Sequence, residues 1–214
     1  MRVLPVVAGV GLASSLLVHA GQAQKVKAIE TAPTFGAVVG VNFATFTGSD
    51  ATGAKTLSGV VFGAQATFSL NPSVFIQPQL LYSTKGAQES SADTTVKVKL
   101  NYIELPVLLG VHLASAQSHT RPYIMAGPTV AVLSSCKISV SFGGASGEAS
   151  CASGSTNSLD LGVTGGAGIE MATGRVTLSL AARYTLGLSK PIKDSNVKNA
   201  GFNVSVGAAI PLGH

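Results

Sequence analysis

The sequence predicts an all-β protein, an eight-stranded antiparallel up-and-down transmembrane β-barrel. The 214-residue chain is 46% hydrophobic and only 11% charged, and it contains 25 glycines. It is therefore poorer in charge and richer in glycine than an average soluble domain. After residue 20, no apolar run approaches the roughly 20 residues that a membrane-spanning helix needs. Eight segments alternate in polarity instead, and a closed barrel satisfies every backbone hydrogen bond in lipid.

The chain begins with a pattern typical of a secretory signal peptide. A positively charged start is followed by an apolar stretch at 3–18 and by small residues up to Ala23. We therefore predict a signal peptide at 1–23, a short periplasmic segment at 24–34 and the barrel domain at 35–214. An uncleaved membrane anchor is the alternative, but glycine and proline interrupt the short apolar stretch.

The first three strand segments are 35–46, 58–70 and 74–84. Each places apolar residues on one face: Phe35, Val39, Val41 and Phe43; Val60, Phe62 and Phe68; and Val74, Ile76, Leu80 and Tyr82. The opposite faces are small or polar and include Gln65 and Gln77. Strict alternation of this kind is expected of strands with lipid on one side and a lumen on the other.

The fourth segment, 96–113, changes phase midway. Val98 and Leu100 place the apolar set at even positions, whereas from Ile103 onward the apolar residues occupy odd positions. A shift of one residue moves every side chain to the other face. We therefore predict a β-bulge between Glu104 and Pro106, where the missing proline N–H does least harm.

The last four segments return to simple alternation at 121–133, 159–172, 175–186 and 201–212. Their connections alternate in length as well. Short links fall around 71–72, 114–120 and 173–174, and long links cover 47–57, 85–95, 134–158 and 187–200. Outer-membrane barrels have short periplasmic turns and long extracellular loops. An even strand number closes the sheet and leaves both termini on the periplasmic side.

Three motifs resemble those of one family of membrane barrels. They are QPQLLYSTKG at 77–86, LNYIELPVLL at 100–109 and RPYIMAGP at 121–128. They resemble the PorT-type outer-membrane β-barrel family, also labelled the porin family or outer membrane protein beta-barrel domain. The resemblance extends from about residue 35 to 212, and it implies a barrel in the bacterial outer membrane but no reaction. Gln79 stands where the family pattern often has Glu, and the chain lacks the terminal aromatic residue of many such barrels.

The interior of an eight-stranded barrel is just filled by side chains. We predict a polar lumen core that contains Gln77, Gln79, Glu104, Glu170 and Arg183. An arginine within the membrane is costly unless it is paired, so we expect Arg183 to pair with Glu170 and also to approach Glu104. Such a core either holds the barrel together or relays protons or small ions.

The only two cysteines, Cys136 and Cys151, fall in the longest link of a chain predicted to be secreted. A disulfide between them is the expected state, with free thiols as the alternative. Two cysteines without a nearby histidine cannot supply the four ligands of structural zinc. We expect no metal and no cofactor.

The positions of the histidines do not favour an enzyme. His112, His119 and His214 all fall toward the predicted periplasmic end, away from the long loops, so a Ser-His-Asp site at the outer rim is not expected. Paired loop carboxylates that act as acid and base are the remaining enzymatic alternative.

The net charge of +5 comes from lysines scattered over the loops, without a basic helix or an aromatic-basic stripe. No nucleic acid is therefore expected as a partner, whereas loop lysines at a membrane surface could meet anionic lipid head groups. The leading hypothesis is a non-enzymatic barrel that is structural, adhesive or surface-binding, with lipid around it and a ligand or protein at its four outer loops. A narrow transport or ion-conducting barrel is the first alternative, and a soluble ligand-binding barrel of the lipocalin type is the second. The oligomeric state stays open.

Overall fold

The computed structural model describes residues 32–91, 93–152 and 154–212. The predicted signal peptide at 1–23, most of the segment 24–34 and His214 lie outside these residues. The strands are β1 (Thr34–Thr47), β2 (Lys55–Ser69), β3 (Val74–Ser91), β4 (Thr94–His112), β5 (Thr120–Phe142), β6 (Ala145–Ser150), β7 (Leu159–Thr173), β8 (Val176–Gly187) and β9 (Lys198–Pro211). None of the described residues forms a helix that could cross a membrane.

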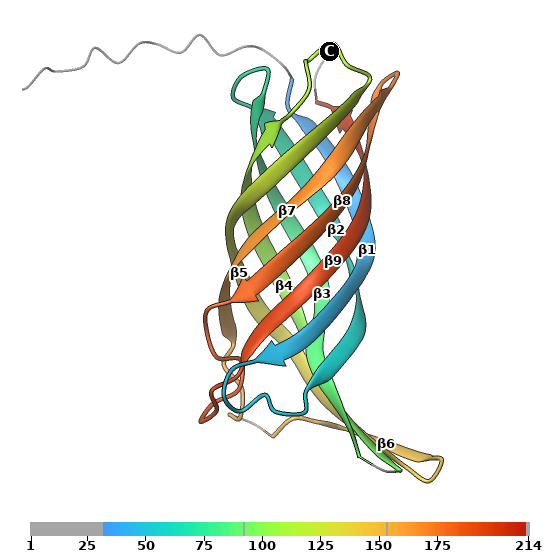
Figure 1. The fold of residues 1–214 in the computed structure, drawn as a ribbon, viewed down its shortest axis with the longest axis vertical. Coiled ribbons are helices and arrows are strands. Elements are labelled where there is room, and N and C mark those ends of the chain that lie inside the picture. The colour runs from blue at the N-terminus through green and yellow to red at the C-terminus, as the bar shows by residue number, and fades with distance from the viewer. Residues whose placement is uncertain (1–31, 92, 153, 213–214) are drawn as a thin grey trace, which may run out of the picture.

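Eight of these strands close into one antiparallel barrel (Figure 1). Each barrel strand pairs with the next along the chain, and β1 closes the ring by pairing with β9. The strand β6 is not part of the ring, because it pairs only with β5. The eight-stranded up-and-down barrel predicted from the alternation is therefore confirmed.

The two faces of the barrel wall differ as the alternation predicts. Val39, Leu180 and Val206 are among the large apolar side chains that point outward and are about half exposed. They belong to neighbouring strands and lie directly opposite one another in the sheet. The outward face is thus a continuous apolar belt, the surface that a barrel presents to lipid.

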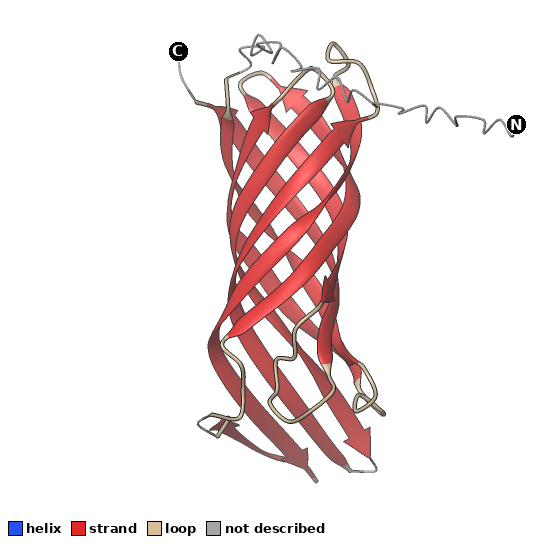
Figure 2. Ribbon diagram, turned by 90° about the vertical axis from the view of Figure 1, so that its left-hand side faces the viewer, coloured by secondary structure: helices blue, strands red, loops and turns tan. Residues whose placement is uncertain are grey.

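Short turns gather at one end of the barrel, together with the start of β1 and the end of β9 (Figure 2). In the β2–β3 turn the Asn71 side-chain oxygen accepts hydrogen bonds from the backbone N–H groups of Ser73 and Val74, at 2.9 and 2.8 Å. Gly174 makes the β7–β8 turn with a φ of 61°, a conformation that glycine adopts without strain. This is the periplasmic end, as the link lengths predict.

The long links on the other side contain more strand than the sequence suggested. The links predicted at 85–95 and 134–158 are largely strand, because β3, β4 and β5 continue past the barrel and β6 adds one further strand. Their ends form a four-stranded sheet of residues 86–91, 94–99, 137–142 and 145–150, which we call the extracellular sheet. It projects beyond the barrel wall at the bottom of Figure 1.

The predicted phase change in β4 is wrong, and the predicted bulge lies on another strand. Tyr102 and Glu104 both point into the lumen, so β4 keeps one phase. Pro106 itself is not paired with β3, but the β3–β4 register is the same on either side of it. The bulge lies on β5 instead, where Ser134 is the extra residue opposite Asn101 and Tyr102. The apolar residues at even positions before Ile103 therefore face the lumen side and do not mark a flip.

Candidate functional site

The centre of the lumen is organised around Arg183, which is almost fully buried. Its guanidinium donates hydrogen bonds to the side-chain oxygens of Gln79, Asn203 and Ser205, with 3.0 Å to Asn203 Oδ1 and 3.3 Å to Ser205 Oγ. Gln79 in turn donates to Gln77 Oε1 at 2.9 Å. The predicted residues Gln77, Gln79 and Arg183 therefore do form one polar network.

The predicted Arg183–Glu170 ion pair is wrong, because the β7–β8 register sets Gly166 opposite Arg183 and Ser179 opposite Glu170. Glu170 lies nearer the periplasmic end and accepts from His112 Nε2 at 2.9 Å. Among the described residues, no ion pair involves Arg183. Amide and hydroxyl oxygens stabilise the guanidinium charge in place of a carboxylate.

Glu104 pairs with a lysine that the sequence reading assigned to a loop. Lys85 Nζ lies 2.6 Å from Glu104 Oε1, and both side chains are less than 10% exposed. Lys85 is an odd-numbered residue of β3, the strand whose odd positions point inward. Extending the alternation beyond residue 84 would have identified it.

A second missed network closes the extracellular end of the lumen. Asp160 accepts hydrogen bonds from Asn199 Nδ2 and Ser189 Oγ, both at 2.6 Å. Asn199 also donates to the Tyr102 hydroxyl at 3.2 Å. Asp160, Asn199 and Tyr102 are all buried at inward positions. The alternation of 159–172 already predicts an inward Asp160, whereas Asn199 fell in the predicted link 187–200, so the contact between them was not predicted.

Apolar layers separate these polar networks. Phe75, Leu108, Tyr123, Met125 and Ala181 form a buried cluster on the periplasmic side, and further clusters lie toward the other end. The cavity left beside the Lys85–Glu104 pair has a volume of about 30 Å³, close to the space of one water molecule. Side chains therefore leave little free space at this level of the lumen.

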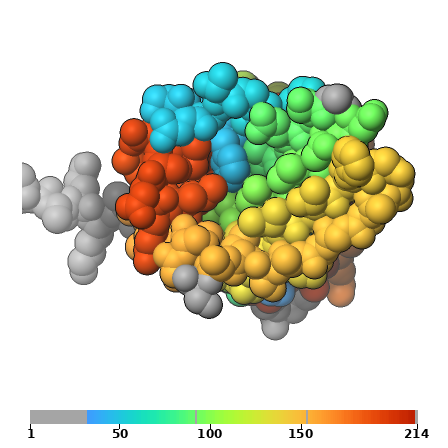
Figure 3. Space-filling view, turned by 90° about the horizontal axis from the view of Figure 1, so that it is seen from below, coloured from blue at the N-terminus to red at the C-terminus, as the bar shows by residue number. Residues whose placement is uncertain are grey.

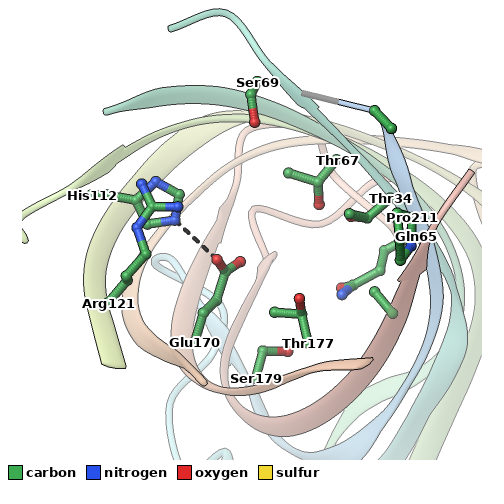
Figure 4. A pocket seen from close by; sticks show the side chains of 12 residues that line it. Thr34, Gln65, Thr67, Ser69, His112, Arg121, Glu170, Thr177, Ser179 and Pro211 are labelled. Carbon is green, nitrogen blue, oxygen red and sulfur yellow. Dashed lines mark hydrogen bonds and ion pairs between the residues drawn. The ribbon is translucent and has the colours of Figure 1, made fainter. Parts of the chain in front are cut away.

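A lumen pocket opens near the periplasmic turns and has a volume of about 320 Å³ (Figure 4). His112 and Glu170 meet on one wall, next to Arg121, whose Nη2 donates to the Pro72 carbonyl at 2.6 Å. Serine and threonine side chains line much of the rest, together with Gln65, two alanines and a proline. Among the described residues, only Glu170 hydrogen-bonds the His112 ring. The described part of the chain also gathers no three His, Cys, Asp or Glu side chains that could hold a metal ion.

Cys136 and Cys151 are joined by a disulfide, with their Cα atoms 5.4 Å apart. The Cys151 backbone N–H also donates to the Cys136 carbonyl at 3.1 Å. The disulfide lies at the open end of the β5–β6 hairpin, next to its first residue pair, Lys137 with Ser150. Closing a loop of this length contributes roughly 3 kcal/mol in the simple chain-entropy model, so the disulfide fixes the base of the hairpin.

The extracellular sheet has two unlike faces, because directly paired residues point to the same side. The lumen-side face is mainly apolar and carries Ala87, Val96, Val98, Ile138, Val140, Phe142, Ala145, Gly147 and Ala149, with the polar residues Glu89, Ser91 and Thr94 in its β3–β4 part. The first loop, residues 48–54, lies against its β3–β4 part and leaves a groove of about 130 Å³. Its β5–β6 part is not covered by that loop: Val140 is 43% and Phe142 65% exposed, in a groove of about 550 Å³. Figure 3 shows this hairpin in yellow at the rim, beyond green β3 and β4 and away from the cyan first loop.

The opposite, membrane-side face is polar and basic. It carries Lys97, Lys99, Lys137, Ser139 and Glu148. Lys137 Nζ lies 2.7 Å from Glu148 Oε1, and Ser139 Oγ donates to Glu148 Oε2 at 3.1 Å. The hydrogen bond that Lys137 donates to Glu148 raises the pKa of Lys137, and the same bond lowers the pKa of Glu148. The pair therefore persists at neutral pH and is lost as the pH falls through the lowered pKa of Glu148.

Sequence comparison identifies one matching family model, the outer membrane protein beta-barrel domain, over residues 22–193. Comparison with curated proteins finds no match.

Among solved structures, Neisserial surface protein A (NspA) is 17% identical with a TM-score of 0.49, over 83% of this chain and 97% of that chain. Ail of Yersinia pestis, in complex with the heparin analogue sucrose octasulfate, is 12% identical with a TM-score of 0.44, over 84% and 99%. The N-terminal β-barrel domain of Pseudomonas aeruginosa OprF is 13% identical with a TM-score of 0.32, over 79% and 96%.

Proposed function

We infer, from the premise that this chain belongs to the outer membrane protein beta-barrel domain family, that it is a non-enzymatic surface-binding barrel of the bacterial outer membrane. The motifs around Gln79, Glu104 and Arg121 favour the PorT type within that family. The partner binds to the lumen-side face of the extracellular sheet, at the β5–β6 hairpin. The barrel serves as the anchor that holds this sheet at the cell surface.

The exposure of Val140 and Phe142 is the observation that carries the proposal. Both side chains lie beyond the apolar belt, in a part of the sheet that faces water. Burying apolar surface there gains roughly 25 cal/mol per Å², and contiguous exposed apolar surface commonly marks an interaction site. The hairpin also offers the free edge of β6, to which an extended peptide can add as a further strand.

The chemistry of the described side chains supports a binding role over a catalytic one. His112 lies at the periplasmic end, in contact with Glu170 and beside the rings of Phe75 and Tyr123. The extracellular sheet, where a surface substrate would arrive, carries carboxylates, hydroxyls and amines but no histidine. A nucleophile activated by a histidine base, a usual arrangement for hydrolysis, is therefore missing from this sheet.

A peptide-binding experiment tests the proposal. The protein is placed in lipid nanodiscs and screened against a display library of random peptides. We expect the selected peptides to be extended and rich in β-branched and aromatic residues, and to lose at least ten-fold in affinity for the Val140→Ser/Phe142→Ser variant. A Ser139→Ala/Ser141→Ala variant, which alters the opposite face of the same strand, is the matched control. Equal affinity for both variants and the wild type would refute the proposed site.

The filled lumen also predicts the outcome for the transport alternative. We expect the refolded protein to insert into planar bilayers without stable conductance, because buried side chains occupy the lumen at several levels. The Arg183→Ala variant, which enlarges the cavity beside Glu104, serves as a comparison. Steady channels in the wild type with an ion preference that changes in Arg183→Ala would contradict the surface-binding role as the main one.

A further inference from the structure

The membrane-side face of the extracellular sheet joins the lipid-facing belt without a break. On β4 the outward residues run from Val111 through Leu109 and Leu105 to Ile103, then become Asn101, Lys99 and Lys97. The register places the Lys137 position on β5 directly opposite Lys99. The lysines therefore stand immediately above the apolar belt, on the side of the wall that faces the membrane.

The height of these lysines lets their amines reach the head-group layer. Lys99 is four residues beyond Ile103, which is about 13 Å along a strand at roughly 3.3 Å per residue. With a strand tilt near 45° this becomes about 9 Å along the membrane normal. The polar layer on each side of a bilayer extends about 5–7.5 Å beyond the hydrocarbon edge, so the Lys99 backbone lies just above that layer. A long lysine side chain can direct its amine back into that layer.

The charges at this site are not balanced within the protein. Like charges directly opposite in a sheet are destabilising, and Lys99 with Lys137 is such a pair. Glu148 contacts Lys137 at 2.7 Å, but among the described residues no ion pair involves Lys97 or Lys99. Three lysines and one glutamate leave two positive charges on a narrow strip of surface, where an anion would relieve their repulsion.

We propose that Lys97, Lys99 and Lys137 form a binding site for the phosphate groups of a phosphorylated glycolipid in the outer leaflet. The three lysines lie on a sheet face whose lower border is the lipid-facing belt, so the phosphate comes from a lipid beside the barrel. The bound head group holds the extracellular sheet against the membrane surface. The proposal concerns the face opposite to the apolar groove and does not depend on peptide binding there.

Binding of lipid A to the folded protein in detergent micelles, measured by native mass spectrometry, tests this site. The Lys97→Gln/Lys99→Gln variant removes the two lysines without an ion pair. Each lysine near a charged membrane surface accounts for about a five-fold change in affinity, so we expect roughly 25-fold weaker binding of diphosphorylated lipid A. The Lys190→Gln/Lys193→Gln variant has the same change in net charge, but both lysines lie in the β8–β9 link, outside this face, so it is expected to bind as the wild type does.

Two further measurements distinguish a lipid-borne phosphate from free inorganic phosphate. Fully dephosphorylated lipid A is expected to bind the wild type as weakly as diphosphorylated lipid A binds the Lys97→Gln/Lys99→Gln variant. Inorganic phosphate, at matched ionic strength, is expected not to displace lipid A. Equal binding of both lipids, an unaffected double variant, or full displacement by inorganic phosphate would each overturn the proposal. Heat-modifiable migration on gels verifies that all variants are folded.

Discussion

The Glu104→Ala variant is expected to lose about 3–5 kcal/mol of unfolding free energy. Glu104 contacts Lys85 at 2.6 Å, and both side chains are buried in the lumen. Arg183, also buried, has no carboxylate partner among the described residues, so the lumen already contains one positive charge that only amides and hydroxyls stabilise. Removing the carboxylate leaves the Lys85 ammonium unpaired as well, in a cavity that admits only about one water.

Equilibrium unfolding in guanidinium chloride, with the protein refolded in lipid vesicles, measures this loss. The Lys85→Met/Glu104→Leu variant is the control, because it replaces both charges with apolar side chains of similar size. Replacing a whole buried pair is often neutral or stabilising, so we expect this double variant to recover most of the lost free energy. A loss below about 1 kcal/mol in Glu104→Ala would show that water reaches Lys85 and hydrates its ammonium group.

The sequence predicted the barrel because the lipid-facing side must be apolar along every strand. Val39, Leu180 and Val206 are examples of that constraint. The short links around 71–72, 114–120 and 173–174 were also placed correctly, whereas the long links were not. The lumen side is far less constrained, since it accepts Phe75 and Leu108 as readily as Gln79 and Arg183. Alternation therefore identifies which residues point inward but not which of them meet.

Partner choice in the lumen depends on strand register and on height along the barrel axis. Arg183 and Glu170 are close in sequence across a two-residue turn, yet the register separates them by four positions on their strands. Lys85 and Glu104 come from β3 and β4, and their pairing required β3 to continue beyond the predicted end at residue 84. Sequence proximity was thus a poor guide, whereas the geometry of the closed sheet determined the contacts.

The extracellular sheet was missed for a related reason. Its strands still alternate, but Val96 and Val98 face the lumen side while Lys97 and Lys99 face the membrane side, the reverse of the order within the bilayer. Above the lipid the rule that apolar residues point outward no longer holds. The alternation consequently resembled a phase change, and the predicted bulge was placed in β4 although it lies on β5.

A charge in the outward belt is expected to have the second large effect. Leu180 lies near the middle of β8, half exposed, and is paired with the outward-facing Ile169 and Val206. Its environment in the membrane is hydrocarbon, so Leu180→Arg is expected to cost about 2–4 kcal/mol of folding free energy. Folding yield in phosphatidylcholine vesicles, followed by heat-modifiable migration, and guanidinium unfolding provide the measurement.

The same substitution at the end of the strand separates burial in lipid from a general intolerance of arginine. Leu188 follows β8 on the extracellular side and is 57% exposed. At that height the arginine reaches the head groups, so Leu188→Arg is expected to cost no more than about 1 kcal/mol. Equal costs at the two positions would mean that the outward face does not span a hydrocarbon layer. A barrel that folds efficiently with Leu180→Arg in aqueous buffer without lipid or detergent would favour the soluble, lipocalin-type alternative.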